Sequence, residues 1–442
     1  MMILKNIWNH RRTNAWIFIE LVLVAIISWS IIDPVAVGLS DLNMPTGYDN
    51  DHMLVVDVVS YPKTAPSYDS TAVTPERRYA DICNLMMKLR NHPDISFVTI
   101  NLNNSMIGGG TRTVVCPGTG DLAADTIRKR SFEFYYFKGT DFFQTYGIES
   151  VEGSPMVEEL SDRYVPMWQE AVVTKAFADL YWPGENPMGK RLMEGINQAT
   201  GDTVFSTVVG VVGDVRHVPV SRSYTQVFRT LDDAWLKEGG STDFYLIARA
   251  REGKDIRELK DEITSWARKE LKAGNYHMRR VRTYDELIER TAVLYGAIGQ
   301  LRLSYVLAGF FLINLILGVI GTFWLQTRKR IPEMGIRRAF GAARGSLIAM
   351  LVKENLLLAT GGCLLGFLIY WQYAFHNGLA NGDETNLEQN VVDNWIGSFG
   401  EHFLIVSLIV YGVIAVCVIV GTLIPAMAVS RVQIVDAIRS KE

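Results

Sequence analysis

One stretch of the sequence has the residue types of a phosphate-binding loop. Residues Gly184 to Arg191 (GENPMGKR) reproduce most of a P-loop, in which backbone amides cradle phosphates and a lysine reaches them. Arg191, however, stands where a serine or threonine hydroxyl would hold magnesium, and the residues before Gly184 have a helical pattern instead of a strand pattern. We therefore expect no nucleotide to bind here.

Other patterns that support catalysis or metal binding are missing from the sequence. The seven histidines are scattered, and the chain contains no H-E-x-x-H, C-x-x-C or G-x-S-x-G. We predict no catalytic residue, no metal site and no directly bound cofactor. Of the cysteines, Cys363 and Cys417 fall in apolar runs, whereas Cys83 and Cys116 leave a disulfide open, because spacing does not decide geometry.

The apolar residues are concentrated in four runs, each long enough to cross a hydrocarbon core of about 30 Å as a helix. Outside the long stretch between the first and second runs, the basic residues cluster between the second and third runs and at both ends of the chain, which places those parts in the cytoplasm. The predicted order is an interfacial helix at 1–14, a first span at 15–34, an external domain at 35–300, a second span at 301–325, a cytoplasmic loop at 326–346, a third span at 347–373, an external loop at 374–402, a fourth span at 403–425 and a cytoplasmic tail at 426–442.

Few polar residues interrupt these spans. Glu20 and Asn314 are candidate intramembrane polar residues, although Glu20 is close enough to the cytoplasmic end to reach headgroup water. Gly362 and Gly366 have the spacing that allows close helix packing. Because no charged path crosses the membrane, the sequence argues against an ion channel, and a net charge of −3 without a basic stripe argues against a nucleic-acid partner.

The external domain contains two β-α-β patterns separated by a long insertion. Residues 52–60, 75–91 and 95–101 read as strand, helix and strand, and 243–250, 255–271 and 277–281 repeat the pattern. This predicts a ferredoxin-like lobe at about 50–107 and 241–283, split by an inserted β-rich lobe at about 108–240. The predicted fold class is an α-helical membrane protein with four transmembrane helices and an extracytoplasmic α+β domain of two lobes.

The loop at 326–346 (QTRKRIPEMGIRRAFGAARGS) is both basic and amphipathic. A solvated loop on the positive inner side is one interpretation. The order of its residues favours another, since PEMGIRRAFGA resembles the E-I-G-I-R-R-A-x-G-A signature of MacB/FtsX-type permeases of ABC transporters, where this segment is the coupling helix that docks on the ATPase. The resemblance assigns ATPase coupling to Glu333, Gly335, Ile336, Arg337, Arg338, Ala339, Phe340, Gly341 and Ala342.

A second stretch in the inserted lobe resembles the periplasmic core domain of the same family. It combines a helix, an F-P-G-x-x-P-x-G-like turn and a V-V-G-V-V-x-D-V-R strand, and the tail from Pro425 also has the family's pattern. In physical terms these residues break a helix, shape a turn and enter a buried strand. The structural motif comprises Pro183, Gly184, Pro187, Gly189, Gly210 and Asp214, and continues to Val215 and Arg216.

The resemblance implies the permease subunit of a MacB/FtsX-like, type VII ABC transporter in the cell inner membrane. ATP and magnesium would be bound by a separate ATPase subunit, the permease would be a homodimer or a heterodimer with a sister permease, and a periplasmic adaptor and an outer-membrane channel are further partners. ATP hydrolysis would move the periplasmic domain by mechanotransmission, for efflux of an antibiotic or peptide. Two alternatives stay open: an FtsX-like regulatory permease that activates a cell-wall hydrolase or senses peptides, and a lipoprotein-release permease.

Overall fold

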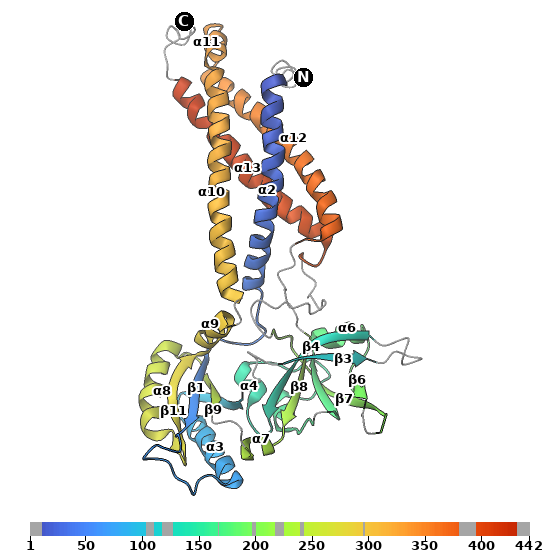
Figure 1. Cartoon of the computed structure of the whole chain (residues 1–442), viewed down its shortest axis with the longest axis vertical. Coiled ribbons are helices and arrows are strands. Elements are labelled where there is room, and N and C mark those ends of the chain that lie inside the picture. Colours follow the sequence, from blue (N-terminus) through green and yellow to red (C-terminus); the bar gives the residue numbers. More distant parts are fainter. Residues whose placement is uncertain are drawn as a thin grey trace. The chain divides into compact units, whose positions relative to one another are not determined.

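The computed structural model describes residues 11–102, 110–116, 127–166, 168–196, 200–216, 225–238, 243–294, 297–379 and 395–430. The chain forms two compact units (Figure 1). The helical unit contains residues 1–40, 299–382 and 393–442, and the external unit contains residues 41–298 and 383–392. Residues 1–10 of the predicted interfacial helix, the centre of the loop at 374–402, and residues 431–442 of the predicted tail lie outside the described residues.

Within the described residues, four helices of the helical unit are long and apolar enough to cross a membrane, as predicted. The first and last described span helices continue through a proline, Pro34 and Pro425 respectively, and the first runs past its predicted end at residue 34. A proline inside a helix removes one hydrogen bond and bends the helix, and the neighbouring helices can hold such a helix together. The helices are α2 (Arg11–Asn43), α10 (Ala297–Lys329), α12 (Arg344–Asn377) and α13 (Phe399–Ser430).

The four helices share one apolar core (Figure 1). Trp29 of α2 is fully buried there and stacks on Tyr370 of α12 and Phe403 of α13, with ring centroids 4.3 and 5.2 Å apart. Two glycines of α12 bring its backbone close to α2. A Cβ added at Gly362 would lie 2.8 Å from Leu21 Cβ, and one added at Gly366 would lie 2.8 Å from Ala25 Cβ.

The first lobe of the external unit is built from β1 (Met53–Ser60), α3 (Pro75–Arg90), β2 (Ile95–Asn101), β9 (Asp243–Ala250), α8 (Ile256–Glu270), the short β10 (Lys272–Ala273) and β11 (Tyr276–Thr283). The strand order β10-β11-β1-β9-β2 is antiparallel throughout. Thr74 caps α3 by accepting a hydrogen bond from the Arg77 amide, and α8 buries Leu259, Ile263 and Ala267. The predicted ferredoxin-like lobe is confirmed.

The inserted lobe is a closed barrel with strand order β3-β4-β8-β5-β7-β6, which confirms the predicted β-rich insertion. Its interior holds an arginine with two carboxylates. Arg229 is fully buried, forms ion pairs with Glu133 and Glu194, and donates to the Glu170 carbonyl oxygen at 2.6 Å. The strands are β3 (Gly110–Cys116), β4 (Ile127–Phe137), β5 (Glu170–Thr174), β6 (Arg191–Ile196), β7 (Thr203–Val212) and β8 (Gln226–Leu231).

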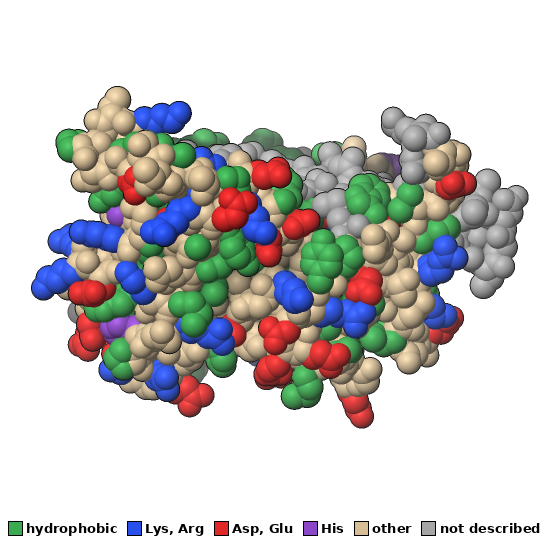
Figure 2. Space-filling model, turned by 90° about the horizontal axis from the view of Figure 1, so that it is seen from below, with side chains coloured by type: hydrophobic (Ala, Val, Ile, Leu, Met, Phe, Trp, Pro, Cys, Tyr) green, Lys and Arg blue, Asp and Glu red, His purple; other side chains and the backbone are tan. Residues whose placement is uncertain are grey.

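Five short helices complete the described part of the external unit. They are α4 (Phe142–Tyr146), α5 (Val157–Asp162), α6 (Lys175–Tyr181), α7 (Ala234–Lys237) and α9 (Tyr284–Leu294), the last of which follows β11 directly. Of these, α7 packs on α3, and α9 packs on β1 and β11. Figure 2 shows one face of the molecule, on which basic and acidic side chains are interspersed. On that face no single sign of charge dominates, which agrees with the small net charge of the chain.

The contact between α12 and α2 predicts the effect of a larger side chain at Gly366. Gly366→Leu should lower the free energy of unfolding by about 1–3 kcal/mol, because the helices must separate or distort to admit it. Titration of the purified protein from mild detergent into SDS measures this. Gly318→Leu on α10 is the matched control, since a Cβ there meets nothing within 4 Å. Equal effects of the two substitutions would contradict close packing at Gly366.

Candidate functional site

The basic segment between α10 and α12 folds as a separate short helix, α11 (Ile331–Ala339). It begins after Arg330, has a proline in its first turn, and ends at Phe340. Gly341 follows with φ +93°, a left-handed conformation that favours glycine, and its amide donates to the Arg338 carbonyl oxygen at 3.0 Å. α11 lies at the same end of the helical unit as the first turns of α2 (Figure 1).

Two apolar side chains of this segment face outward. Ile336 is 52% exposed and Phe340 is 89% exposed, although both are large and hydrophobic. Gly335, on the same helix, is buried. Within the described part of the chain, no packing contact buries the Phe340 side chain, so this helix end presents an exposed apolar surface.

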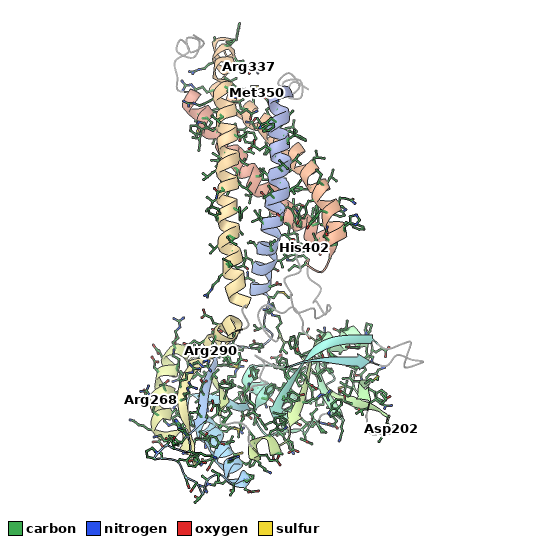
Figure 3. The ribbon with its side chains drawn as sticks, in the orientation of Figure 1. Asp202, Arg268, Arg290, Arg337, Met350 and His402 are labelled. Carbon is green, nitrogen blue, oxygen red and sulfur yellow. The ribbon has the colours of Figure 1, made fainter. Side chains whose placement is uncertain are left out.

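Arg337 links α11 to the start of α12. Its guanidinium donates to Glu333 Oε1 at 2.9 Å and to the sulfur of Met350 at 3.1 Å, and Figure 3 shows Arg337 and Met350 close together. Next to this contact, Leu347 and Leu351 of α12 pack on Ala426 of α13, and Met350 packs against the same cluster. α11 is therefore attached to the helical unit on one side and presents Ile336 and Phe340 on another.

A buried ion pair lies at the start of this segment. Arg330 at the start of α11 and Glu354 on α12 lie 2.8 Å apart, with side chains 9% and 3% exposed. Charges removed from water are stable only when they are paired. The pair therefore fixes the end of α10 against α12, and α11 between them.

The intramembrane polar residues have defined partners. Glu20 Oε1 accepts a hydrogen bond from the Thr322 hydroxyl of α10 at 2.8 Å, which joins two helices. Asn314 is exposed, and its amide donates to the Phe310 carbonyl oxygen one turn earlier at 2.7 Å, so Asn314 satisfies its own helix instead of reaching a neighbour. Both interactions are local or pairwise, and neither shows a path across the membrane.

Sequence reasoning missed a polar pair elsewhere in this unit. Asp33 of α2 and His402 of α13 lie 2.6 Å apart, with side chains 3% and 1% exposed, and the Trp29 indole donates to the Ser407 hydroxyl at 3.1 Å. His402 is labelled in Figure 3, away from Arg337. Both residues stand at the edges of apolar runs, where charged residues are common, so no sequence signal marks them as partners.

The second motif builds a turn and a strand end in the barrel lobe. Gly184 and Gly189 have φ values of +75° and +76°, and the Lys190 amide donates to the Pro187 carbonyl oxygen at 3.1 Å. Helix α6 precedes this turn, so the P-loop-like sequence lacks the strand that a P-loop requires. The turn around Pro183 continues from α6 through a hydrogen bond from the Glu185 amide to the Trp182 carbonyl oxygen at 3.0 Å.

The strand end of the motif is tightly packed. A Cβ at Gly210 would lie 2.7 Å from Leu160 Cδ2. Asp214 Oδ1 accepts a hydrogen bond from the Ala176 amide at 2.6 Å. Burial raises the pKa of the Asp214 carboxyl, and the hydrogen bond from the Ala176 amide opposes that rise. The motif thus joins β7 to the start of α6.

One group of potential metal ligands comes together in the external unit. His92, Asp94 and Glu262 place ligand atoms within 4.8 Å of one another. The Lys254 ammonium already lies 2.6 Å from Asp94, and its hydrogen bond lowers the pKa of that carboxyl. His92 Nδ1 accepts from the Asp94 amide, so the proton of the neutral ring is on Nε2. The group is an ion-pair cluster, and it is not assigned as a metal site.

Cys83 is a free thiol, and the side chain of Cys116 lies outside the described ones.

Comparison with known proteins confirms the predicted resemblance. Residues 305–434 match the family described as FtsX-like permease C-terminal. The macrolide export ATP-binding/permease protein MacB of Marinobacter nauticus is 27% identical over 207 residues, covering 45% of this chain and 29% of that protein. MacB of Agrobacterium fabrum is 25% identical over 239 residues, covering 52% and 34%. The chain thus spans about a third of the length of these curated relatives.

Solved structures of external domains are also similar. The periplasmic region of MacB from Actinobacillus actinomycetemcomitans has a TM-score of 0.31 at 12% identity and covers 57% of this chain and 97% of that one. The extracellular domain of the ABC-type transporter YknZ from Gram-positive bacteria has a TM-score of 0.27 at 11% identity and covers 51% and 100%.

The buried Arg330–Glu354 pair and the exposed Arg337–Glu333 pair should contribute different amounts to the free energy of unfolding. Glu354→Gln should lower the free energy of unfolding by about 3 kcal/mol or more, because it leaves the Arg330 guanidinium buried without its counter-charge. Glu333→Gln, which removes the exposed partner of Arg337, should cost less than about 0.5 kcal/mol. SDS titration measures both.

The exchanged pair Arg330→Glu with Glu354→Arg provides the control for the buried position. It keeps both charges and should recover more than half of the stability that Glu354→Gln loses. A double exchange as unstable as the single substitution would show that the charges do not act as a pair.

Proposed function

We propose that this chain, in which residues 305–434 match the family described as FtsX-like permease C-terminal, is the membrane subunit of an ABC transporter that works with a separate ATP-binding subunit. The names of the curated MacB relatives include both an ATP-binding and a permease role, and this chain covers about a third of their length. ATP and magnesium are bound by the partner, and this chain holds no cofactor of its own.

The observation that carries the proposal is the outward face of α11. Ile336 and Phe340 are exposed, while Arg330 and Arg337 attach the segment to α12. A short helix with an exposed apolar face fits the groove of a partner protein, where the apolar residues supply affinity. Arg337 and Arg338, in the last turn of α11, favour an acidic rim around that groove.

The positions of the basic residues support the orientation. α10 ends at Arg328 and Lys329, and α11 adds Arg337 and Arg338 at the same end of the helical unit. Because basic residues concentrate on the cytoplasmic side, this end faces the cytoplasm and the ATP-binding subunit. The first turns of α2 and the last turns of α13 then also face the cytoplasm, and the external unit lies outside the inner membrane.

In the proposed mechanism, ATP binding moves the external unit through mechanical displacement of helices. Closure of the ATP-binding subunits on ATP displaces α11, and the Arg330–Glu354 pair passes that displacement to α10 and α12 as one body. Two helices continue along the chain into the external unit. α10 follows α9, and α2 leads to β1. A second copy of this chain or a sister permease completes the dimer, and the movement of the external units exports a substrate such as an antibiotic or a peptide from the periplasmic side.

Replacing both exposed apolar residues of α11 tests the proposal. Ile336→Asp with Phe340→Asp should reduce recovery of the ATP-binding subunit by about tenfold or more, because buried carboxylates in an apolar groove are strongly unfavourable. The tagged chain is purified from detergent-solubilised native membranes, and the proteins that come with it are quantified by mass spectrometry.

Ile336→Leu with Phe340→Leu is the matched control, because it keeps the apolar character and should retain the partner. Normal recovery of an ATP-binding subunit by the aspartate variant would refute docking through α11. The same measurement separates functions. An adaptor and an outer-membrane channel among the partners indicate efflux, whereas a cell-wall hydrolase or a kinase indicates signalling.

A further inference from the structure

The last turn of α2 is held by an arginine from the barrel lobe. Arg216 is 1% exposed, and its guanidinium donates through Nη1 to the Asp41 carbonyl oxygen at 3.0 Å and through Nη2 to the Met44 carbonyl oxygen at 2.7 Å. Asp41 is in the last turn of α2 and already belongs to the external unit. One planar side chain therefore binds both the helix end and the chain that leaves it.

This contact satisfies two needs of a helix C-terminus. The last carbonyl groups of a helix have no partner within it, and the helix dipole places partial negative charge there. The last turn of α2 contains no basic residue of its own. Arg216 supplies both the donors and the positive charge, and a guanidinium can reach two carbonyl groups at once, which a lysine ammonium does less well.

The backbone strengthens the same contact. The Arg216 amide donates to the Thr46 carbonyl oxygen at 2.8 Å. Gly47 has φ +80°, and a Cβ there would lie only 1.8 Å from the Asp214 carbonyl oxygen, so only glycine fits this close approach. Tyr48 follows, buried with its ring 6.0 and 5.8 Å from those of Tyr146 and Tyr284.

The two residues before Arg216 are themselves held in place by hydrogen bonds and packing. Asp214 is held by the Ala176 amide, and the Val215 carbonyl oxygen accepts from Gln226 Nε2 at 3.3 Å. Val215 is fully buried in the apolar core between the barrel and the ferredoxin-like lobe. The segment that connects α2 to β1 is therefore held in place by hydrogen bonds and packing. Its length and its glycine alone would suggest a flexible linker.

We propose that Arg216 is a positioning residue that joins the first membrane helix to the inserted lobe, so that movement of the outer end of α2 reaches the barrel. This inference rests on the proposed function for the source of that movement. The joint is the contact of the Arg216 guanidinium and amide with residues 41–46. Without this contact, the segment after α2 would be flexible, and movement of α2 would not reach the barrel.

Hydrogen–deuterium exchange of the full chain in complex with its ATP-binding subunit tests the joint, with and without ATP. In Arg216→Gln without nucleotide, exchange in peptides covering residues 41–48 should become roughly tenfold faster or more, because charge-assisted hydrogen bonds are lost. With ATP, the exchange change in the barrel strands seen in the unmodified complex should disappear, whereas the change near α11 should persist. A role in stability alone would not separate these two responses.

Arg163→Gln is the matched control. Arg163 makes two hydrogen bonds to Glu170, at 2.9 and 2.8 Å, in the same lobe without touching α2. It should leave residues 41–48 and the response to ATP unchanged. Arg216→Lys keeps the charge and should restore part of both signals, and it replaces Arg216→Gln in the assay if that variant does not fold.

The outcomes distinguish the two proposals. A barrel response to ATP that persists in Arg216→Gln overturns the joint while leaving the proposed function intact. An unmodified complex without any response to ATP overturns the mechanical function and the transmitting role together. Unchanged exchange at residues 41–48 in Arg216→Gln, with or without nucleotide, overturns the capping role itself.

Discussion

The buried pair of Arg330 and Glu354 is the interaction on which the end of the helical unit that carries α11 depends. Two charges with less than a tenth of their side-chain surface exposed are stable only while they face each other. The pair therefore restricts how α10 and α12 can move apart, and α11, which lies between them in the chain, must move with them.

In the external unit, the chain passes twice between the two lobes. Its ferredoxin-like lobe is interrupted between β2 and β9 by the whole barrel, so the barrel is attached at two neighbouring strands of one sheet. A closed barrel has no free edge. The ion pairs of Arg229 with Glu133 and Glu194 connect three strands of this barrel, β8, β4 and β6.

The sequence was sufficient for features that depend on local pattern. The apolar runs predicted the four span helices, and the two β-α-β patterns predicted the split lobe, because periodicity and caps such as Thr74 and Asp255 are local signals. Helix ends were less predictable. α2 runs past Pro34 to Asn43, since the neighbouring helices and Arg216 hold a turn that the sequence alone would end.

The residues that hold distant parts together were not predictable from pattern. Arg216 and Asp41 are 175 positions apart, and Asp33 and His402 are 369 apart, so only the folded chain shows that they meet. The motif ending in Arg216 was recognisable, but its local chemistry explained only a turn and a strand. The contact with α2 gives the arginine a physical reason, because a buried guanidinium needs several acceptors and the end of a helix supplies carbonyl groups that need donors. The guanidinium of Arg216 and the carbonyl groups at the end of α2 therefore provide each other's hydrogen-bond partners. Neither segment could supply these partners from its own stretch of sequence.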